Sequence, residues 1–466
     1  MPKTFRLASI AVAMTFAAPA AWSQESLLDI YQRALQNDPS IREAEANFRA
    51  TIEAKPQARS NLLPGLSLSS GRSSRFSESP SGAVIPSTGE VFGTGNEVTS
   101  TTENLSLSLT QTIFDWGQYT QLRQADKTVA RAETDFEVAK QDLLIRVAEA
   151  YFNVLAAEDT LASEVAARES IARQLEQAQR RFEVGLIAIT DVQESQAGFD
   201  SAVAAEIQAQ RALATSQEFL REIIGDYVSE LAGPIDDLPL LTPDPANAEE
   251  WVRTALRQNL SLISSRINAD IVEDDITIQR AGRFPTLSFS AGVSDSSTDT
   301  VAIIDVLDPL TGLPTRRTNA SNSAPQGYNW SFDLRVPLFA GGLNSSRIQQ
   351  AVYRHRAAME GLERVARQTE RQTRDAYLGV ISEISRVQAL RQSVESSQTA
   401  LRATEAGFEV GTRTTVDVLA SQDVLRRAQT NYARSRYDYM LNILRLQLAA
   451  GGLAIEDIEQ IDTWLQ

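Results

Sequence analysis

Two short segments of this chain repeat each other and carry charged side chains at matching places. Residues 181–192 read RFEVGLIAITDV, and residues 407–418 read GFEVGTRTTVDV. Each segment has a glycine, Gly185 or Gly411, and six residues later an aspartate, Asp191 or Asp417. A carboxylate after a chain reversal can cap the free N–H groups of the next helix. Where several copies surround one axis, the same carboxylates attract cations. The two aspartates are therefore predicted either to attract cations or, as the simpler alternative, to cap helices.

Side chains for covalent or metal chemistry are scarce. The chain has no cysteine and one histidine, His355, on a polar stretch that is expected to be helical. A histidine without partner histidines is expected to be a surface residue rather than a ligand, which disfavours zinc and thiol chemistry. Asp274 and Asp275 are adjacent and would point apart on a helix, and no phosphate-binding glycine loop occurs. We expect no enzyme activity, no cofactor and no structural metal.

The repeated segments each interrupt two long helical stretches. Residues 118–182 contain neither proline nor glycine, and a helix of that length extends for about 100 Å. The spacing of a coiled-coil seam is seen in Leu144, Ala148, Tyr151 and Leu155. Further helices are expected over 191–224, 344–408 and 416–449, with shorter ones over 25–57 and 247–280. The sequence thus predicts two helical hairpins whose turns are the repeated segments.

Between the short and the long helices, apolar residues alternate with serine or threonine. One such run contains Leu105, Leu107, Leu109 and Ile113, and similar runs occur at 66–68, 287–293 and 330–338. Each half should therefore have two strands, separated by long polar loops at about 77–102 and 295–326. The alternation fits either a soluble sheet packed on a core or a sheet that faces lipid. Phe284, Tyr328 and Trp330, near the strand ends, favour lipid.

Residues 1–23 are predicted to be a signal peptide. Lys3 and Arg6 precede an apolar run at 7–20, and Ala21-Trp22-Ser23 offers a cleavage site. The chain is therefore expected to be exported, and without cysteine it is not a lipoprotein. The mature chain would comprise two structural repeats, 24–246 and 247–466. The formal net charge of −16 argues against nucleic acid as a partner, and it fits a solvated acidic exterior or an acidic lumen.

A four-stranded sheet in lipid cannot form all of its backbone hydrogen bonds, since an open sheet edge leaves N–H and C=O groups without partners. The smallest membrane barrels have about eight strands. Two chains would give eight strands around an interior filled by side chains, whereas three chains would give twelve strands and a passage. We therefore expect a mixed α and β fold that forms a homotrimer: a 12-stranded β-barrel, four strands per chain, continuous with a long α-helical coiled-coil tunnel.

Three segments resemble the TolC family of trimeric outer-membrane channel proteins: YFNVL at 151–155, VGLIAITDV at 184–192 and VGTRTTVDVL at 410–419. The resemblance covers about residues 25–466. It implies an outer-membrane β-barrel surrounded by lipid and a periplasmic tunnel, in a Gram-negative bacterium. It also implies docking through a periplasmic adaptor onto an inner-membrane pump, either an ABC transporter or a proton-driven pump.

The resemblance implies an exit duct for tripartite efflux or type I secretion, with small toxic compounds or unfolded proteins as cargo. The alternative is an exported structural coiled-coil protein without channel activity, which the strand pairs and the paired turns disfavour. Within the resemblance, Asp417 falls at the family's acidic entrance ring, where cations could block the passage. The second ring position is Ala420, so weaker cation binding is expected, and Asp423 is not counted as a replacement.

The resemblance further implies residues that hold the helical tips shut at rest. These gate residues are Asp191, Thr190 and Arg413, with Gln174 and Glu405 at further positions on the lumen side. Phe408 stands where the family commonly has a tyrosine, so one hydrogen bond is lost. The adaptor-docking tips would be Val184, Gly185, Leu186, Val410, Gly411 and Thr412. From the residues alone, the two glycines form turns at a helix end, and Thr415 or Asp417 caps the second return helix.

Overall fold

The computed structural model describes residues 24–84, 88–89, 91–228, 230–235, 237–308, 310–311 and 313–465. The predicted signal peptide, residues 1–23, lies outside the described residues. The chain forms two compact units. Unit 1 comprises the chain up to Ala44, Glu137–Asn259 and the chain from Gln368 onward, whereas unit 2 comprises Glu45–Phe136 and Leu260–Arg367. Each unit therefore takes segments from both halves of the sequence.

The helices of the described residues follow the predicted order. They are α1 (Leu27–Asn37), α2 (Pro39–Ile52), α3 (Ala54–Ser60), α4 (Trp116–Glu183), α5 (Ile189–Ile224), α6 (Ala248–Gln258), α7 (Leu260–Ala281), α8 (Leu343–Glu409), α9 (Thr415–Ala450) and α10 (Ile455–Asp462). Short helices followed by a long helix pair occur in each half, as the repeat predicts. Over the part of the chain that is described, no helix combines the length and the apolar character needed to cross a membrane.

Some helix boundaries differ from the prediction. The predicted helix 25–57 is divided into α1, α2 and α3, and the predicted helix 247–280 into α6 and α7. Asp38 accounts for the first division, because its Oδ1 accepts the backbone N–H groups of Ser40 (2.8 Å) and Ile41 (3.0 Å) and so starts a new helix. The return helices α5 and α9 begin slightly earlier than predicted, at Ile189 and Thr415.

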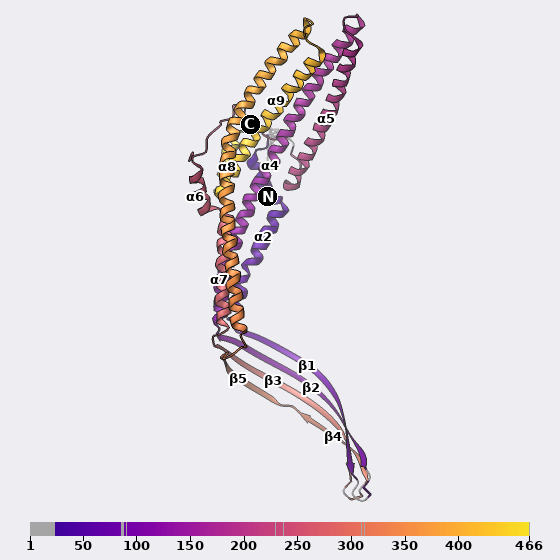
Figure 1. The fold of residues 1–466 in the computed structure, drawn as a ribbon. Helices are drawn as coiled ribbons and strands as arrows, with labels where there is room; N and C mark the ends of the chain where they lie inside the picture. The colour runs from indigo at the N-terminus through magenta and orange to yellow at the C-terminus, as the bar shows by residue number, and fades with distance from the viewer. Residues whose placement is uncertain are drawn as a thin grey trace, which may run out of the picture. The chain divides into compact units, whose positions relative to one another are not determined.

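The strands of unit 2 form one antiparallel sheet (Figure 1): β1 (Gly65–Val84), β2 (Val91–Phe114), β3 (Thr286–Leu307), β4 (Pro314–Ser323) and β5 (Gln326–Arg335). The order is β1-β2-β3-β4, and β5 also pairs with β3. β5 and β4 pair with successive parts of β3, so together they make one strand path, interrupted at Ala324 and Pro325. Proline favours such a break because it lacks the ladder N–H. The described residues thus contain the four strand paths that the sequence predicts.

The prediction of long loops inside the sheet is wrong, because the strands run through most of both stretches. β1 is paired with β2 along its whole length, and β3 and β4 occupy most of residues 295–326. Serine and threonine do not mark loops here, since their hydroxyls meet across the strands. Thr102 and Thr298, for example, lie 3.1 Å apart between their Oγ1 atoms. Threonine also favours strands through its branched side chain.

The core of unit 1 includes the contact between α4 and α9. The predicted seam is confirmed as buried, with exposed fractions of at most 5% for Leu144, Ala148, Tyr151 and Leu155. Next to it, the rings of Phe152 and Tyr437 stack with their centroids 5.8 Å apart. The hydroxyl of Tyr437 donates to Oδ2 of Asp159 at 2.7 Å, so this buried polar group has a partner.

Both ends of the described chain are held by the segment that follows α5. Glu25 forms a bridge with Leu231, and Leu465 forms one with Pro234. The carboxylate of Asp462, at the end of α10, accepts hydrogen bonds from the first two N–H groups of α1, at 3.0 and 3.2 Å. Ser26 and Asp29 form the capping box of α1, and Asp462 of α10 adds acceptors for two N–H groups that this box leaves free.

Candidate functional site

The turn between α4 and α5 is the first tip of unit 1. The N–H of Gly185 donates to the carbonyl of Phe182 (2.8 Å), and the N–H of Leu186 donates to the carbonyl of Arg181 (2.9 Å). This pair of hydrogen bonds closes a helix on a left-handed residue, and Gly185 has a φ of 77°. The predicted turn-forming role of this glycine is confirmed, since other residues are strained at such a φ.

The turn between α8 and α9 is the second tip, and it repeats the same geometry. Gly411 has a φ of 75° and donates to the carbonyl of Phe408 (3.1 Å), while Thr412 donates to that of Gly407 (2.8 Å). The side chain of Arg413 crosses Gly407 closely: a Cβ added at Gly407 would lie 2.8 Å from Cγ of Arg413. Figure 1 shows both tips at the same end of unit 1.

The two aspartates of the repeat act as helix caps. Asp191 and Asp417 are each the third residue of their helix. Oδ2 of Asp191 accepts the backbone N–H of Ala188 at 3.3 Å. Oδ2 of Asp417 accepts both the backbone N–H (2.8 Å) and the hydroxyl (2.9 Å) of Thr414, whose Oγ1 accepts the N–H of Asp417 (3.3 Å). The cap of α9 is therefore Thr414 together with Asp417, and not Thr415, which is buried.

Asp417 is the better stabilised of the two carboxylates. Its pKa is lowered, first by the backbone N–H of Thr414, then by the hydroxyl of Thr414 and by the positive charge of Arg413. Nη1 of Arg413 lies 4.0 Å from Oδ1 of Asp417, and both side chains are substantially open to solvent. Water screens such a pair strongly. Asp417 is consequently ionised at neutral pH and presents its charge to the solvent.

The structure joins the two tips through a contact that the sequence did not predict. The guanidinium carbon of Arg181 lies 5.0 Å from the centroid of the Phe408 ring, within the range of a cation–π interaction. Phe408 was expected only to lack a hydroxyl, but its ring has a partner of its own. A signal was present in the repeat: the two copies match at this aromatic position, whereas Arg181 matches Gly407.

The other predicted gate residues are spread over both tips. Thr190 is exposed at the start of α5, and Glu405 is exposed on α8. Gln174 on α4 is only 9% exposed, and its amide atoms have no hydrogen-bond partner in the described chain. Within the described residues, no ion pair joins Asp191 of the first tip to Arg413 of the second. A single chain thus brings Arg413 and Asp417 together, but not Arg413 and Asp191.

Farther from the tips, polar contacts hold the two hairpins together. Glu164 of α4 is 7% exposed and pairs with Arg426 of α9, which also pairs with Asp423. Arg427 adds a second guanidinium to Asp423 at 2.8 Å. Asp423 is therefore neutralised by its neighbours, and this agrees with not counting it as a replacement for the missing acidic position. Neither Glu164 nor Arg426 was predicted, because a pairing across hundreds of residues leaves no local pattern.

A contact that depends on a glycine lies between the same two hairpins. A Cβ added at Gly198 of α5 would lie 3.2 and 3.3 Å from the two methyl carbons of Leu419 of α9. The absence of a side chain at Gly198 therefore lets α5 and α9 approach closely. The two hairpins thus meet through an apolar contact at Leu419 and through the ion pair at Arg426.

Comparison with known proteins decides the family. A family model described as "Outer membrane efflux protein" matches residues 30–226 and 251–452. This chain belongs to the outer membrane efflux protein family. It is 33% identical to "Outer membrane protein TolC" of Vibrio cholerae, over 98% of this chain and 97% of that protein. It is 28% identical to "Alkaline protease secretion protein AprF" of Pseudomonas aeruginosa, over 93% of this chain and 86% of that protein.

The fold agrees with solved channels of the same kind. The CmeC outer membrane channel of Campylobacter jejuni superposes with a TM-score of 0.69 at 17% sequence identity, over 96% of this chain and 91% of that one. The expectation of a mixed α and β, internally duplicated channel fold is thereby confirmed. As an outer membrane efflux protein, the chain is an exit duct located in the outer membrane of a Gram-negative bacterium. Both tips lie inside the segments that match the family.

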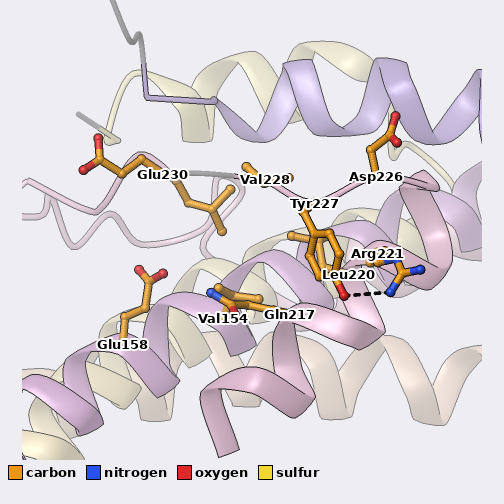
Figure 2. Close-up of a pocket in the computed structure, with 10 residues that line it drawn as sticks. Val154, Glu158, Gln217, Leu220, Arg221, Asp226, Tyr227, Val228 and Glu230 are labelled. Carbon is orange, nitrogen blue, oxygen red and sulfur yellow. Dashed lines mark hydrogen bonds between the residues drawn. The ribbon is translucent and has the colours of Figure 1, made fainter. Parts of the chain in front are cut away.

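Figure 2 shows a pocket in unit 1 of this efflux protein, and the volume of this pocket is too small for cargo. It lies between α4, the end of α5 and the segment that follows, and it has about 10 Å³ of space for water, roughly one molecule. Burial raises the pKa of Glu158 in its wall, and the charges of Asp159 and Glu230 add to that effect. The hydroxyl of Tyr227 lies 2.7 Å from Nη1 of Arg221. These partners indicate a structural role for the pocket.

Proposed function

We propose that three copies of this chain form the outer-membrane exit duct of a tripartite export system. Its periplasmic entrance is formed by the helical tips, and a periplasmic adaptor connects it to an inner-membrane pump, either an ABC transporter or a proton-driven one. The cargo is small toxic compounds or unfolded proteins. The two faces of the sheet in unit 2 carry this proposal, since they differ in polarity in the way that a channel wall in lipid requires.

One face of the sheet carries neighbouring apolar rows that cross all four strand paths. Pairing sets Leu66 of β1 opposite Leu109 of β2, Leu109 opposite Ala291 of β3, and Ala291 opposite Trp330 of β5. The adjacent row on the same face contains Leu68, Leu107, Val293 and Tyr328. In the single chain Leu66 is 67% exposed and Trp330 65%. Such a wide exposed apolar surface requires an apolar environment, which lipid supplies.

The other face is polar and suits a water-filled passage. Ser67 and Ser108 approach to 2.7 Å between their hydroxyl oxygens, and Ser290 and Ser331 approach to 2.8 Å. These residues lie on the strand positions between the apolar ones, because side chains alternate from face to face. Lipid on one side and water on the other is the arrangement that this alternation favours.

The edges of the sheet support an assembly of several chains. In the described residues, β1 pairs only with β2, and the path made by β4 and β5 pairs only with β3. Both edges therefore carry unpaired backbone groups, which lipid does not tolerate. Pairing β1 of one copy with the opposite edge of the next would close the sheet. Three copies give twelve strand paths and a central passage, whereas two copies give a filled interior.

At the entrance, the same three-fold arrangement would bring the tips together. Three copies of Asp417 would face one axis, and their ionised carboxylates would attract cations that block the passage. Arg413, Asp191, Thr190, Phe408, Gln174 and Glu405 would form the contacts that keep the tips shut. The docking surface for the adaptor would be the exposed apolar residues at the turns: Val184 (70% exposed), Leu186 (72%) and Val410 (75%). Exposed apolar side chains that cluster in this way typically mark an interaction site.

The test uses two neighbouring positions on opposite faces of β2. Leu107→Arg puts a charge on the face assigned to lipid, where an arginine costs about 2–4 kcal/mol near the bilayer centre. Ser108→Arg puts the same charge in the passage and is the matched control. We expect Leu107→Arg to remove the trimer from the outer membrane, whereas Ser108→Arg assembles and changes ion conductance in planar bilayers. Equal assembly of both variants would contradict the assignment of the faces.

The sequence alone left open an exported structural coiled-coil protein without channel activity, and the family match argues against it. Its long helices would suffice for that role, but the exposed apolar face of the sheet would then have no partner. Membrane fractionation, native mass and bilayer conductance separate the two functions. A soluble rod without conductance would favour the structural protein. A deletion strain with normal drug resistance and normal protein secretion would also contradict the export duct.

A further inference from the structure

We propose that Arg181 and Phe408 form a tie between the two helical tips of one chain, and that this tie helps to hold the tunnel entrance closed. The inference rests on the proposed entrance. It goes further by assigning a positioning role to Arg181, a residue outside the gate contacts considered above. It also gives Phe408 a bonding role that does not need a hydroxyl.

The backbone positions of both residues are fixed by the turns. Arg181 lies near the end of α4, and its carbonyl accepts the N–H of Leu186; Phe408 lies near the end of α8, and its carbonyl accepts the N–H of Gly411. Neither residue is part of a free loop. The 5.0 Å between the guanidinium carbon and the ring centroid is therefore set by how the two hairpins pack, and it will change when one tip moves against the other.

The guanidinium of Arg181 is available for the ring. Among the ion pairs of the described chain none involves Arg181, whereas its neighbour Arg180 pairs with Glu176 on its own helix. Arg181 and Phe408 are both half-buried. Partial removal from water strengthens a cation–π contact compared with a fully exposed one. The contact is thus the interaction that the structure shows for this charged side chain.

The first tip supplies the arginine and the second tip supplies the ring. The reverse contact is missing, because the two copies of the repeat differ. Gly407 occupies the position that matches Arg181, so the second tip has no arginine to place on Phe182, which is 41% exposed. The space above Gly407 is taken instead by the side chain of Arg413. Within the described residues, one aromatic contact therefore joins the two tips, and Arg413 stays close to Asp417.

The tie depends on charge and on an aromatic ring, and this makes it testable. Single-channel conductance of the purified full-length protein in planar bilayers is the readout. We expect Arg181→Gln, which keeps side-chain length but removes the charge, and Phe408→Leu, which removes the ring, to increase the open fraction. One cation–π contact corresponds to a change of about two- to fivefold. Arg181→Lys keeps the charge and should stay close to the parent, and Phe408→Tyr keeps the ring and should open no more than the parent.

Arg180→Gln is the matched control, since it removes the same charge one residue earlier without touching Phe408. It should leave the open fraction unchanged. The double variant Arg181→Gln, Phe408→Leu should open no more than either single variant, because both remove the same contact. The proposal would be wrong if Arg180→Gln increased the open fraction as much as Arg181→Gln does. It would also be wrong if the two effects were additive in the double variant.

The absence of native cysteine allows a second test. Arg181→Cys with Phe408→Cys, joined by a short thiol-specific cross-linker, should hold the entrance closed until the cross-link is cleaved. An entrance that opens equally with the cross-link intact would contradict the inference. If the parent protein itself forms no conducting trimer, the proposed function fails. If the parent conducts normally and Arg181→Gln gates as the parent does, only the tie fails.

Discussion

Asp191 and Asp417 occupy the same place in the two copies of the repeat, and each returns its carboxylate to the backbone N–H three residues earlier. The copies differ in the residue that receives this bond. Ala188 offers the first aspartate only a backbone N–H (3.3 Å), whereas Thr414 offers the second both an N–H (2.8 Å) and a hydroxyl (2.9 Å). The start of α9 is therefore capped more completely than the start of α5.

Exchanging the capping residues should exchange the stability of the two helix starts. Thr414→Ala removes the hydroxyl from the second cap and should destabilise the first turn of α9 by about 1 kcal/mol. Ala188→Thr should protect the first turn of α5 by a similar amount. Amide hydrogen exchange at each tip measures both changes. Unchanged exchange at α9 in Thr414→Ala would show that the hydroxyl contributes nothing to the cap.

Block by cations at the entrance should depend on Asp417 and should have a characteristic pH dependence. The bonds from Thr414 lower the pKa of Asp417 below its ordinary value, which is about 3.9. The carboxylate is therefore charged at every pH above that value and loses its charge only as the pH falls through the lowered pKa. Block by a trivalent cation should stay constant from about pH 8 to about pH 5 and weaken only below about pH 4.

Asp417→Ala should weaken the same block at neutral pH, and Asp191→Ala should weaken it less. Thr414→Val removes the hydroxyl and should move the loss of block to a higher pH, because the charged form of Asp417 then has fewer donors. Conductance titrations with the cation measure all three variants. If Asp417→Ala and the parent protein were equally sensitive to the cation, Asp417 would not contribute to the block.

Arg413→Ala should loosen the closed entrance. Arg413 lies 4.0 Å from Asp417 in an open environment, so the attraction is screened by salt. The closed-state conductance should rise in Arg413→Ala, and the difference from the parent should shrink as the salt concentration increases. Arg413→Lys retains the charge and should behave almost as the parent. A closed conductance that does not respond to Arg413→Ala would exclude a gating role for this residue.

The ion pair between Glu164 and Arg426 should stabilise the packing of the hairpins much more than its exposed neighbour does. Arg426→Ala would leave the Glu164 carboxylate, whose side chain is 9% exposed, without its partner. We expect a loss of about 3 kcal/mol, the lower end of the range for buried pairs. Arg427→Ala removes a guanidinium that is 70% exposed and should cost under about 1 kcal/mol. Thermal or denaturant unfolding compares the two variants, and equal losses would contradict a special role for the buried pair.

Local patterns allowed much of the fold to be predicted. Gly185 and Gly411 indicate turns because only glycine adopts a positive φ without strain, and the spacing of Leu144 and Tyr151 indicates a buried helix seam. The strand limits were missed because serine and threonine are common in both loops and polar strands. The start of α5 was misplaced because Ala188 carries no capping side chain, so Asp191 appeared to begin the helix.

The contacts between the hairpins could not be predicted from local patterns. Arg181 and Phe408, or Glu164 and Arg426, lie hundreds of residues apart in the sequence, and their meeting depends on how two long helix pairs pack. The resemblance to a family indicated which tip residues to consider, but it did not indicate Arg181. An alignment of the two repeats does point to Arg181, because it places this arginine opposite Gly407. At that position the two copies cannot make the same side-chain contact.

The two hydrogen bonds that Asp462 accepts from the start of α1 have a consequence for folding. The carboxylate and the N–H of Leu27 that it accepts are 435 residues apart, so these bonds form only when α10 has reached α1. The hairpins can close earlier, since their turns are local. Unit 1 is therefore complete only when α10 has packed against α1. Truncations of a few C-terminal residues should therefore leave the beginning of the chain immature and open to proteolysis.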